Sequence, residues 1–178
     1  MSKAIDKNKL NSLQIAASKM LTKFLIGATL VCCVFAIRSF TYANSVTTVK
    51  VQGQSMEPTF DNGTYINVDT NIEDIQRYDI IITYTFQDVD TPIVKRVYGL
   101  PNETIQLKGH DVYVNGKKLE NVYYEDSAIF GNTNEYGNTP FTLGEDEYFV
   151  LGDNIKESVD SRTKGPIKYG MIIAKYKK

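Results

Sequence analysis

The stretch VTTVKVQGQSMEPT, residues 46–59, joins a short strand to a constrained turn. Residues 46–51 are rich in β-branched side chains and alternate in polarity, which predicts a strand. Gly53 permits backbone angles closed to other residues, and Pro58 fixes its own φ. The turn therefore holds a small hydroxyl, that of Ser55, between a strand and a loop. Such a serine is either a nucleophile, which needs a neighbouring base, or a turn residue that satisfies local backbone groups.

The chain after this turn reads as all-β. Its apolar segments are short, β-branched or aromatic-rich, and bounded by Gly, Pro, Asn or Asp. Residues 80–82 (III) are apolar on both faces and predict a central buried strand, and Asn115-Gly116 predicts a two-residue hairpin. Residues 125–140 are polar and predict an exposed loop. The expected strands are residues 46–51, 64–68, 78–85, 92–98, 104–107, 111–114, 117–119, 147–151 and 171–176.

These strands predict one all-β domain, built as a folded sheet or partly open barrel. About 130 residues of short strands are enough to enclose one core.

The N-terminus carries a localisation signal. Residues 24–37 hold no charge and lie between Lys23 and Arg38. In one interpretation residues 20–42 span the membrane as a helix, and the two flanking cations reach the surfaces. In the other the segment is a cleavable signal peptide, with Ala43 before the cut. The long basic region before the apolar run and its helical spacing of apolar residues favour the uncleaved anchor.

Charge is distributed unevenly along the chain. Residues 1–43 carry a net charge of +5 and residues 44–178 a net charge of −6. Five lysines before the apolar run predict a cytoplasmic N-terminus and an extracytoplasmic body. The acidic body argues against nucleic acid as a partner. We expect a basic cytoplasmic segment at 1–19, an anchor at 20–43 in contact with membrane lipid, and a catalytic β domain at 44–178.

Lys95 is the candidate base for Ser55. In the strand expected at 92–98 it shares a face with two apolar residues, Ile93 and Val97. Burial there lowers the pKa of a lysine, and only a neutral amine can take a proton from a serine. The alternative is a strand lysine whose amine reaches solvent.

Other kinds of site find less support in the sequence. His110 is the single histidine and lies beside the expected hairpin, where a surface role is the simpler interpretation. The two cysteines, Cys32 and Cys33, both lie in the apolar run, which argues against a disulfide framework or a zinc site in the body. We expect no metal and no cofactor.

Three motifs follow one another along the body. They are SMEPT at 55–59, VKRVYGLP at 94–101, and GDN at 152–154 followed by ESVDSR at 157–162. In this order they resemble the type I signal peptidases, which are membrane-anchored Ser-Lys endopeptidases. The resemblance covers most of residues 46–174, and the short chain resembles the compact Gram-positive type.

The resemblance implies roles for individual residues. It implies Ser55 as the nucleophile and Lys95 as the general base. It also implies that the Ser158 hydroxyl orients the lysine amine and that Asp160 and Arg162 form a charged pair. A structural role falls to Asp153. The apolar candidates for a substrate pocket are Val51, Met56 and Val94, of which only Met56 and Val94 lie within the matched motifs.

The sequence departs from the family pattern at three places. Ile155 stands where arginine is common after GDN, and Asn102-Glu103 stands where Gly-Asp is usual after GLP. Gly53 stands where some relatives carry a hydroxyl for the oxyanion hole, so the Ser55 backbone N–H would do more of that work. These departures leave the substrate range open.

The function implied is the removal of signal peptides from exported preproteins with small residues at positions −1 and −3 before the cut, by a monomer. Three alternatives stay open at this point. They are a specialised or inactive homologue that assists surface-fibre (pilus) assembly, a self-cleaving Ser-Lys repressor relative, and an anchored extracellular binding domain.

Overall fold

The chain forms two compact units, Met1–Asn44 and Ser45–Lys178. A computed structural model describes residues 7–85, 88–109, 111–120, 122–123, 136 and 139–177. His110 and most of the expected loop at 125–140 lie outside these residues.

The described part of the first unit belongs to one helix, α1 (Lys7–Ser45). Its segment Ala17–Ile37 is long and apolar enough to cross a membrane. At 1.5 Å per residue, these 21 residues extend about 31 Å, which matches the hydrocarbon core of a bilayer. Inside the segment the hydroxyls of Thr22 and Thr29 donate to helix carbonyls one turn back, so these polar groups are satisfied within the helix.

The second unit contains an antiparallel sheet that, in the described part of the chain, has seven strands. Neighbouring strands in this sheet are often far apart in the sequence. In spatial order these are β1 (Val46–Lys50), β2 (Tyr65–Asp69), β11 (Ile172–Tyr176), β3 (Ile80–Thr85), β4 (Asp88–Gly99), β9 (Glu147–Leu151) and β10 (Ile167–Lys168). Because β1 and β10 are its two edges, the sheet is open and does not close into a barrel. The all-β fold with one N-terminal apolar helix is therefore confirmed, in its folded-sheet form.

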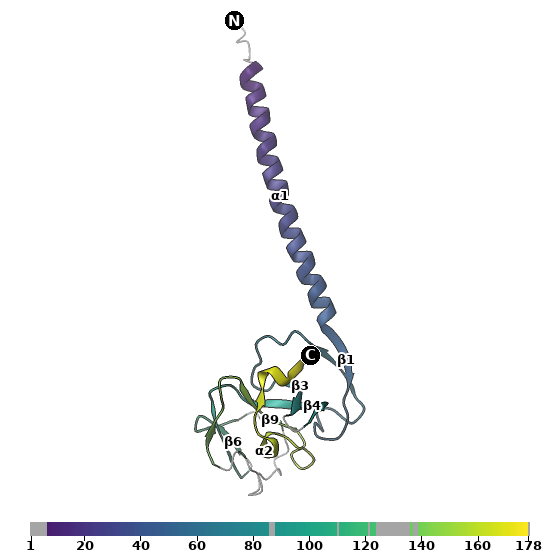
Figure 1. The fold of residues 1–178 in the computed structure, drawn as a ribbon, viewed down its shortest axis with the longest axis vertical. Helices are drawn as coiled ribbons and strands as arrows, with labels where there is room; N and C mark the ends of the chain where they lie inside the picture. The colour runs from purple at the N-terminus through teal and green to yellow at the C-terminus, as the bar shows by residue number, and fades with distance from the viewer. Residues whose placement is uncertain are drawn as a thin grey trace. The chain divides into compact units, whose positions relative to one another are not determined.

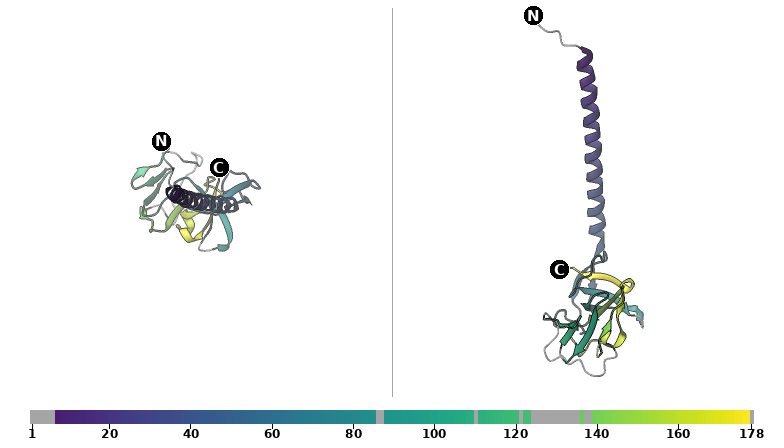
Figure 2. Two further views of the ribbon diagram at one scale, coloured as in Figure 1. Left: turned by 90° about the horizontal axis from the view of Figure 1, so that it is seen from above. Right: turned by 90° about the vertical axis from the view of Figure 1, so that its left-hand side faces the viewer.

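A smaller sheet packs at one end of this body, and Figure 1 shows its strand β6 away from β1. Over the described residues its order is β7 (Lys117–Lys118), β6 (Asp111–Val114), β5 (Thr104–Lys108) and β8 (Phe141–Thr142). The predicted hairpin is confirmed, since β6 pairs with β7 and both Asn115 and Gly116 take positive φ, 51° and 76°. Figure 2 shows the strands of the body from two further sides.

Buried apolar side chains gather in clusters on both faces of the large sheet. The cluster beneath the turn after β1 consists of Val51, Met56, Phe60, Ile66, Val68, Ile80, Ile82 and Ala174. The prediction of a central strand at 80–82 is confirmed, because β3 lies between β11 and β4 and its three isoleucines are all buried. Burial of each such side chain contributes roughly 1.5–3 kcal/mol to stability. The cluster therefore stabilises the turn, which contributes Met56 to it.

Some elements had no signal in the sequence. The two-residue strands β8 and β10, the one-turn helix α2 (Ser161–Lys164) and the 3₁₀ turn η1 (Tyr169–Met171) are too short to show a period. The strand expected at 78–85 begins only at Ile80, because Tyr78 adopts a positive φ of 72° and interrupts the extended chain.

Candidate active site

Ser55 lies on the turn between β1 and β2, and the turn is fixed from several sides. Gly53 has a φ of 84°, and its N–H donates to the Asn62 side chain at 3.0 Å. Met56 is fully buried in the apolar cluster beneath the turn. The carbonyl of Ser55 accepts a hydrogen bond from the Asn154 N–H at 3.0 Å. The turn is therefore held both by its own core contact and by the segment that follows β9.

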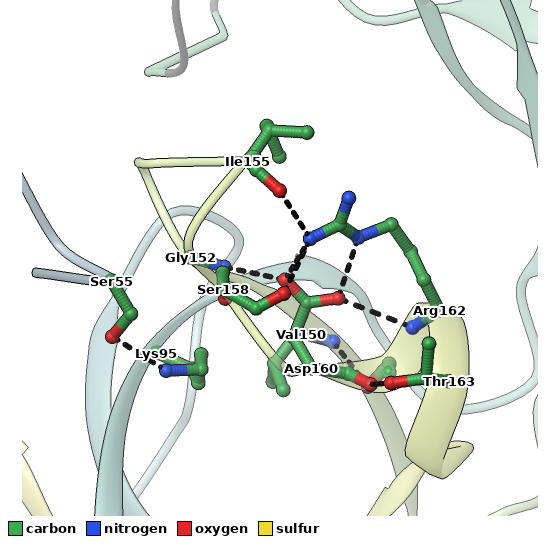
Figure 3. A network of polar contacts seen from close by, with 10 residues as sticks. Ser55, Lys95, Val150, Gly152, Ile155, Ser158, Asp160, Arg162 and Thr163 are labelled. Atoms are coloured by element: carbon green, nitrogen blue, oxygen red, sulfur yellow. Dashed lines mark hydrogen bonds and ion pairs between the residues drawn. The ribbon is translucent and has the colours of Figure 1, made fainter. Parts of the chain in front are cut away.

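Lys95 comes from β4, where it pairs with Ile81 of β3. Only 3% of its surface is exposed. Its Nζ lies 2.8 Å from Ser55 Oγ and donates to the Val94 carbonyl at 2.9 Å. Figure 3 shows the two side chains pointing toward each other, the serine from the turn and the lysine from the strand. The serine and lysine that the sequence singled out 40 residues apart are thus in hydrogen-bond contact.

The surroundings of the amine favour its neutral form. Burial lowers the pKa of Lys95 from 10.5 to about 8. The Asp160 carboxylate opposes this shift by attracting the charged ammonium, Arg162 adds to it by repulsion, and Asp153 opposes it. At a pKa of about 8, roughly a tenth of the amines are neutral at pH 7, so a base is available near neutral pH.

Ser158 lies close to this pair in an unusually tight place. A Cβ added to Gly152 would lie 2.3 Å from Ser158 Oγ and 2.4 Å from the Ser55 carbonyl oxygen. Only a glycine, which has no Cβ, lets the Ser158 hydroxyl and the Ser55 carbonyl both lie this close to residue 152. The Ser158 hydroxyl is buried and has no hydrogen-bond partner among the described residues. Its hydrogen-bonding capacity is therefore free beside the dyad of Ser55 and Lys95 (Figure 3).

Asp160 and Arg162 form a buried bidentate ion pair. Arg162 Nε donates to Asp160 Oδ1 at 2.7 Å, and its Nη2 donates to Oδ2 at 2.9 Å. The same Nη2 donates to the carbonyls of Ile155 and Ser158, both at 2.9 Å. Asp160 also caps α2 and accepts the Gly152 N–H at 3.0 Å. The pair thus joins the segment of Ser158 to the segment of Gly152.

Asp153 forms a second buried ion pair, with Arg96. Arg96 Nε donates to Asp153 Oδ1 at 2.8 Å, and the Thr59 hydroxyl donates to Oδ2 at 2.5 Å. Sequence reasoning did not assign roles to Arg96 or Thr59, although both lie within the motifs. The available signal was that a charged residue inside a buried strand needs a partner of opposite charge.

The three residues proposed for a substrate pocket lie at the large sheet beside the dyad. Val51 and Met56 are 2% and 0% exposed and belong to the cluster beneath the turn, and Val94 packs against that cluster. Their part in substrate recognition stays a prediction.

The departures from the family pattern have local structural reasons. Asn102 has a φ of 65°, and asparagine tolerates this left-handed conformation better than most residues. Glu103 accepts the Leu100 N–H at 2.7 Å and pairs with Arg77 at 2.6 Å. Ile155 is buried in the cluster between the smaller sheet, β4 and β9. These residues serve packing and turn geometry.

Metal ligands are not grouped in the described part of the chain: no three His, Cys, Asp or Glu side chains there could hold an ion together. The chemistry available at the site is that of a serine hydroxyl beside a buried amine.

Comparison with known proteins gives one consistent family. Residues 20–178 match the family described as "Signal peptidase, peptidase S26". A signal peptidase I of Bacillus caldolyticus is 36% identical over 160 residues, which are 82% of each chain. A signal peptidase I P of Bacillus subtilis subsp. natto is 33% identical over 138 residues, 72% of this chain and 71% of that relative.

A solved structure of a signal peptidase I from Enterococcus faecalis V583 is 32% identical, with a TM-score of 0.46, and covers 57% of this chain and 96% of that one. The family match covers most of the apolar segment and the whole body, so the sequence resemblance is confirmed. The chain belongs to the signal peptidase family, peptidase S26, and resembles its Gram-positive type I members.

Proposed function

We propose that this membrane-anchored serine peptidase removes signal peptides with a Ser55–Lys95 dyad. The observation that carries the proposal is the 2.8 Å contact between Lys95 Nζ and Ser55 Oγ, with the amine buried. Family membership supports the reaction, and the contact supports the assignment of the two residues.

The direction of the hydrogen bond depends on the proton. A charged ammonium donates to Ser55 Oγ and leaves the hydroxyl unactivated. The neutral amine has a lone pair that can accept the hydroxyl proton over the same distance, while one N–H still donates to Val94 O. Burial, which lowers the pKa of Lys95 to about 8, therefore makes the reactive form accessible.

The reaction then has two stages. Ser55 Oγ attacks the scissile carbonyl carbon as Lys95 takes its proton, and the Ser55 N–H stabilises the oxyanion. The Lys95 ammonium gives this proton to the leaving amine as the peptide bond breaks, which leaves an acyl-serine. A water molecule, deprotonated by Lys95, attacks the acyl carbon, and the returning proton restores the Ser55 hydroxyl.

The neighbouring polar groups have supporting roles. The unpartnered Ser158 hydroxyl is suited to accept an N–H of Lys95 and so to aim the lone pair at Ser55. The ion pair of Asp160 and Arg162 fixes the backbone of Ser158 through its carbonyl. Asp153, paired with Arg96, fixes the segment that binds the Ser55 carbonyl.

The proposed substrates are exported preproteins with small residues at −1 and −3. The apolar helix places the enzyme in the membrane, and the excess of lysines before it supports a cytoplasmic N-terminus and an extracytoplasmic body. The alternatives of fibre assembly and of an anchored binding domain receive no support from the comparisons.

The test is cleavage of a labelled preprotein by the full chain in detergent micelles. We expect the wild type to cut it and Ser55→Ala and Lys95→Arg to leave it intact, because a guanidinium does not lose its proton in proteins. Circular dichroism checks that both variants are folded, and Lys117→Met, at an exposed site of β7, is the matched control. An active Lys95→Arg variant contradicts the dyad.

A further inference from the structure

Thr59 links the two elements that carry the dyad. It lies four residues after Ser55 on the same turn, and its hydroxyl donates to Asp153 Oδ2 at 2.5 Å. Asp153 is held by Arg96, which follows Lys95 directly on β4. The contacts therefore form a closed ring that runs from serine to threonine, aspartate, arginine and lysine and back to serine.

The ion pair in this ring is buried, whereas Thr59 is exposed. Asp153 is 0% and Arg96 5% exposed, whereas Thr59 is an exposed residue and lines, with Arg96, a cavity of about 730 Å³. The ion pair of Asp153 and Arg96 is held in place by its burial in the core. The Thr59 hydroxyl is the group through which the exposed turn is attached to it.

A second attachment lies close by. The Asn154 N–H donates to the Ser55 carbonyl at 3.0 Å, and Asn154 is the neighbour of Asp153. The turn thus meets the segment after β9 at two points, one at the nucleophile itself and one at Thr59. With two points of attachment the turn has little freedom to rotate, and a hydroxyl-to-carboxylate hydrogen bond is among the stronger kinds.

From this ring we infer that Thr59 is a positioning residue for the reaction: its hydroxyl, bound to Asp153, sets the distance between Ser55 Oγ and Lys95 Nζ. The inference rests on the proposed dyad. Loss of the hydroxyl leaves both reacting groups and the core in place, but it releases one of the two attachments of the turn to the segment after β9. A displacement of about 1 Å at a reacting atom can lower a rate by up to 100-fold.

Thr59→Val is the decisive variant, because it removes the hydroxyl and keeps the shape. We expect kcat for preprotein cleavage to fall about tenfold, with KM within about twofold, since the change affects alignment and not substrate contact. Thr59→Ser restores the hydroxyl and should recover most of kcat. Thr142→Val is the matched control: Thr142 is exposed, and its hydroxyl contacts Thr104 in the smaller sheet.

A second test of the inference does not depend on peptidase activity. Amide hydrogen exchange at Asn154, followed by nuclear magnetic resonance, should be about tenfold faster in Thr59→Val, because the bond to the Ser55 carbonyl opens more often. The Leu143 amide, bonded to Glu103 O, should exchange as in the wild type.

The outcomes separate the two claims. A wild type that leaves the preprotein intact contradicts the proposed function, while the exchange at Asn154 still decides whether Thr59 holds the turn. Unchanged exchange at Asn154, unchanged kcat in Thr59→Val, an equal loss in Thr142→Val, or no recovery in Thr59→Ser overturns the inference.

Discussion

Replacement of Lys95 by methionine should abolish cleavage and at the same time stabilise the fold. Methionine has a similar length and no charge, so it fills the space of the lysine stem among apolar neighbours. Wild-type Lys95 is 3% exposed, and burial lowers its pKa from 10.5 to about 8. That shift measures how much the folded protein disfavours the ammonium relative to the unfolded chain.

The size of the effect follows from the shift. A pKa difference of about 2.5 corresponds to roughly 3–4 kcal/mol at about 1.4 kcal/mol per pKa unit. The variant loses hydrogen bonds to Ser55 and Val94, each worth about 1 kcal/mol net, so a gain of about 1–2 kcal/mol should remain.

The gain should depend on pH in a defined direction. Below about pH 8 the lysine is charged in both the folded and unfolded states, and the wild type carries the full penalty. Between about 8 and 10.5 the unfolded chain binds the proton that the folded state has released, so wild-type stability rises with pH. The advantage of Lys95→Met should therefore be largest at pH 7, disappear near about pH 9, and reverse by pH 10.5, where the variant still lacks the two hydrogen bonds.

Urea unfolding of the full chain in micelles, followed by circular dichroism at pH 7 and pH 10, measures this difference. Lys117→Met on the exposed strand β7 is the control and should change the free energy of unfolding by less than about 0.5 kcal/mol. A Lys95→Met variant that is less stable than the wild type at pH 7, or a gain that grows with pH, would refute the desolvation argument.

The remaining predictions concern the supporting residues and the topology. Gly152→Ala should lower cleavage at least about tenfold, because its Cβ would clash with Ser158 Oγ and the Ser55 carbonyl; cleavage within twofold of the wild type contradicts this. Arg162→Met should cost about 3–5 kcal/mol in urea unfolding, because it leaves the Asp160 carboxylate buried without its partner, and addition of Asp160→Asn should recover part of the loss. Protease added to intact protoplasts should digest the body; complete protection, followed by digestion once the membrane is opened, contradicts the proposed topology.

Most strands of the two sheets could be predicted from local sequence. Residues 111–114 and 147–151 form β6 and β9 with the expected bounds, because alternation and turn residues mark both ends. The open sheet was foreseen only as one of two possibilities, since strand order depends on contacts between distant segments. The two-residue strands β8 and β10 exist only through pairing with β5 and β9, which no local pattern encodes.

The catalytic residues could be predicted because they lie in recognisable motifs, whereas the contacts that position them could not. Ser55 and Lys95 come from motifs 40 residues apart, and only the paired strands and the turn bring them to 2.8 Å. The ring through Thr59 and Arg96 could not be foreseen, because Asp153 reaches both across the fold. The left-handed Tyr78 was missed for another reason: tyrosine usually favours strands, and here contacts with Tyr98 and Tyr123 accompany the unusual backbone.

The pH dependence of preprotein cleavage tests the dyad most directly. The measurement is the single-turnover cleavage rate of one labelled preprotein by the full chain in micelles, from pH 5 to pH 10, for the wild type and His110→Ala. Since the neutral amine of Lys95 is the base, the rate should rise with pH and reach half its maximum near pH 8, with the same midpoint in both proteins. A midpoint near 6.5 that disappears together with activity in His110→Ala would contradict Lys95 as the base and assign that role to a histidine.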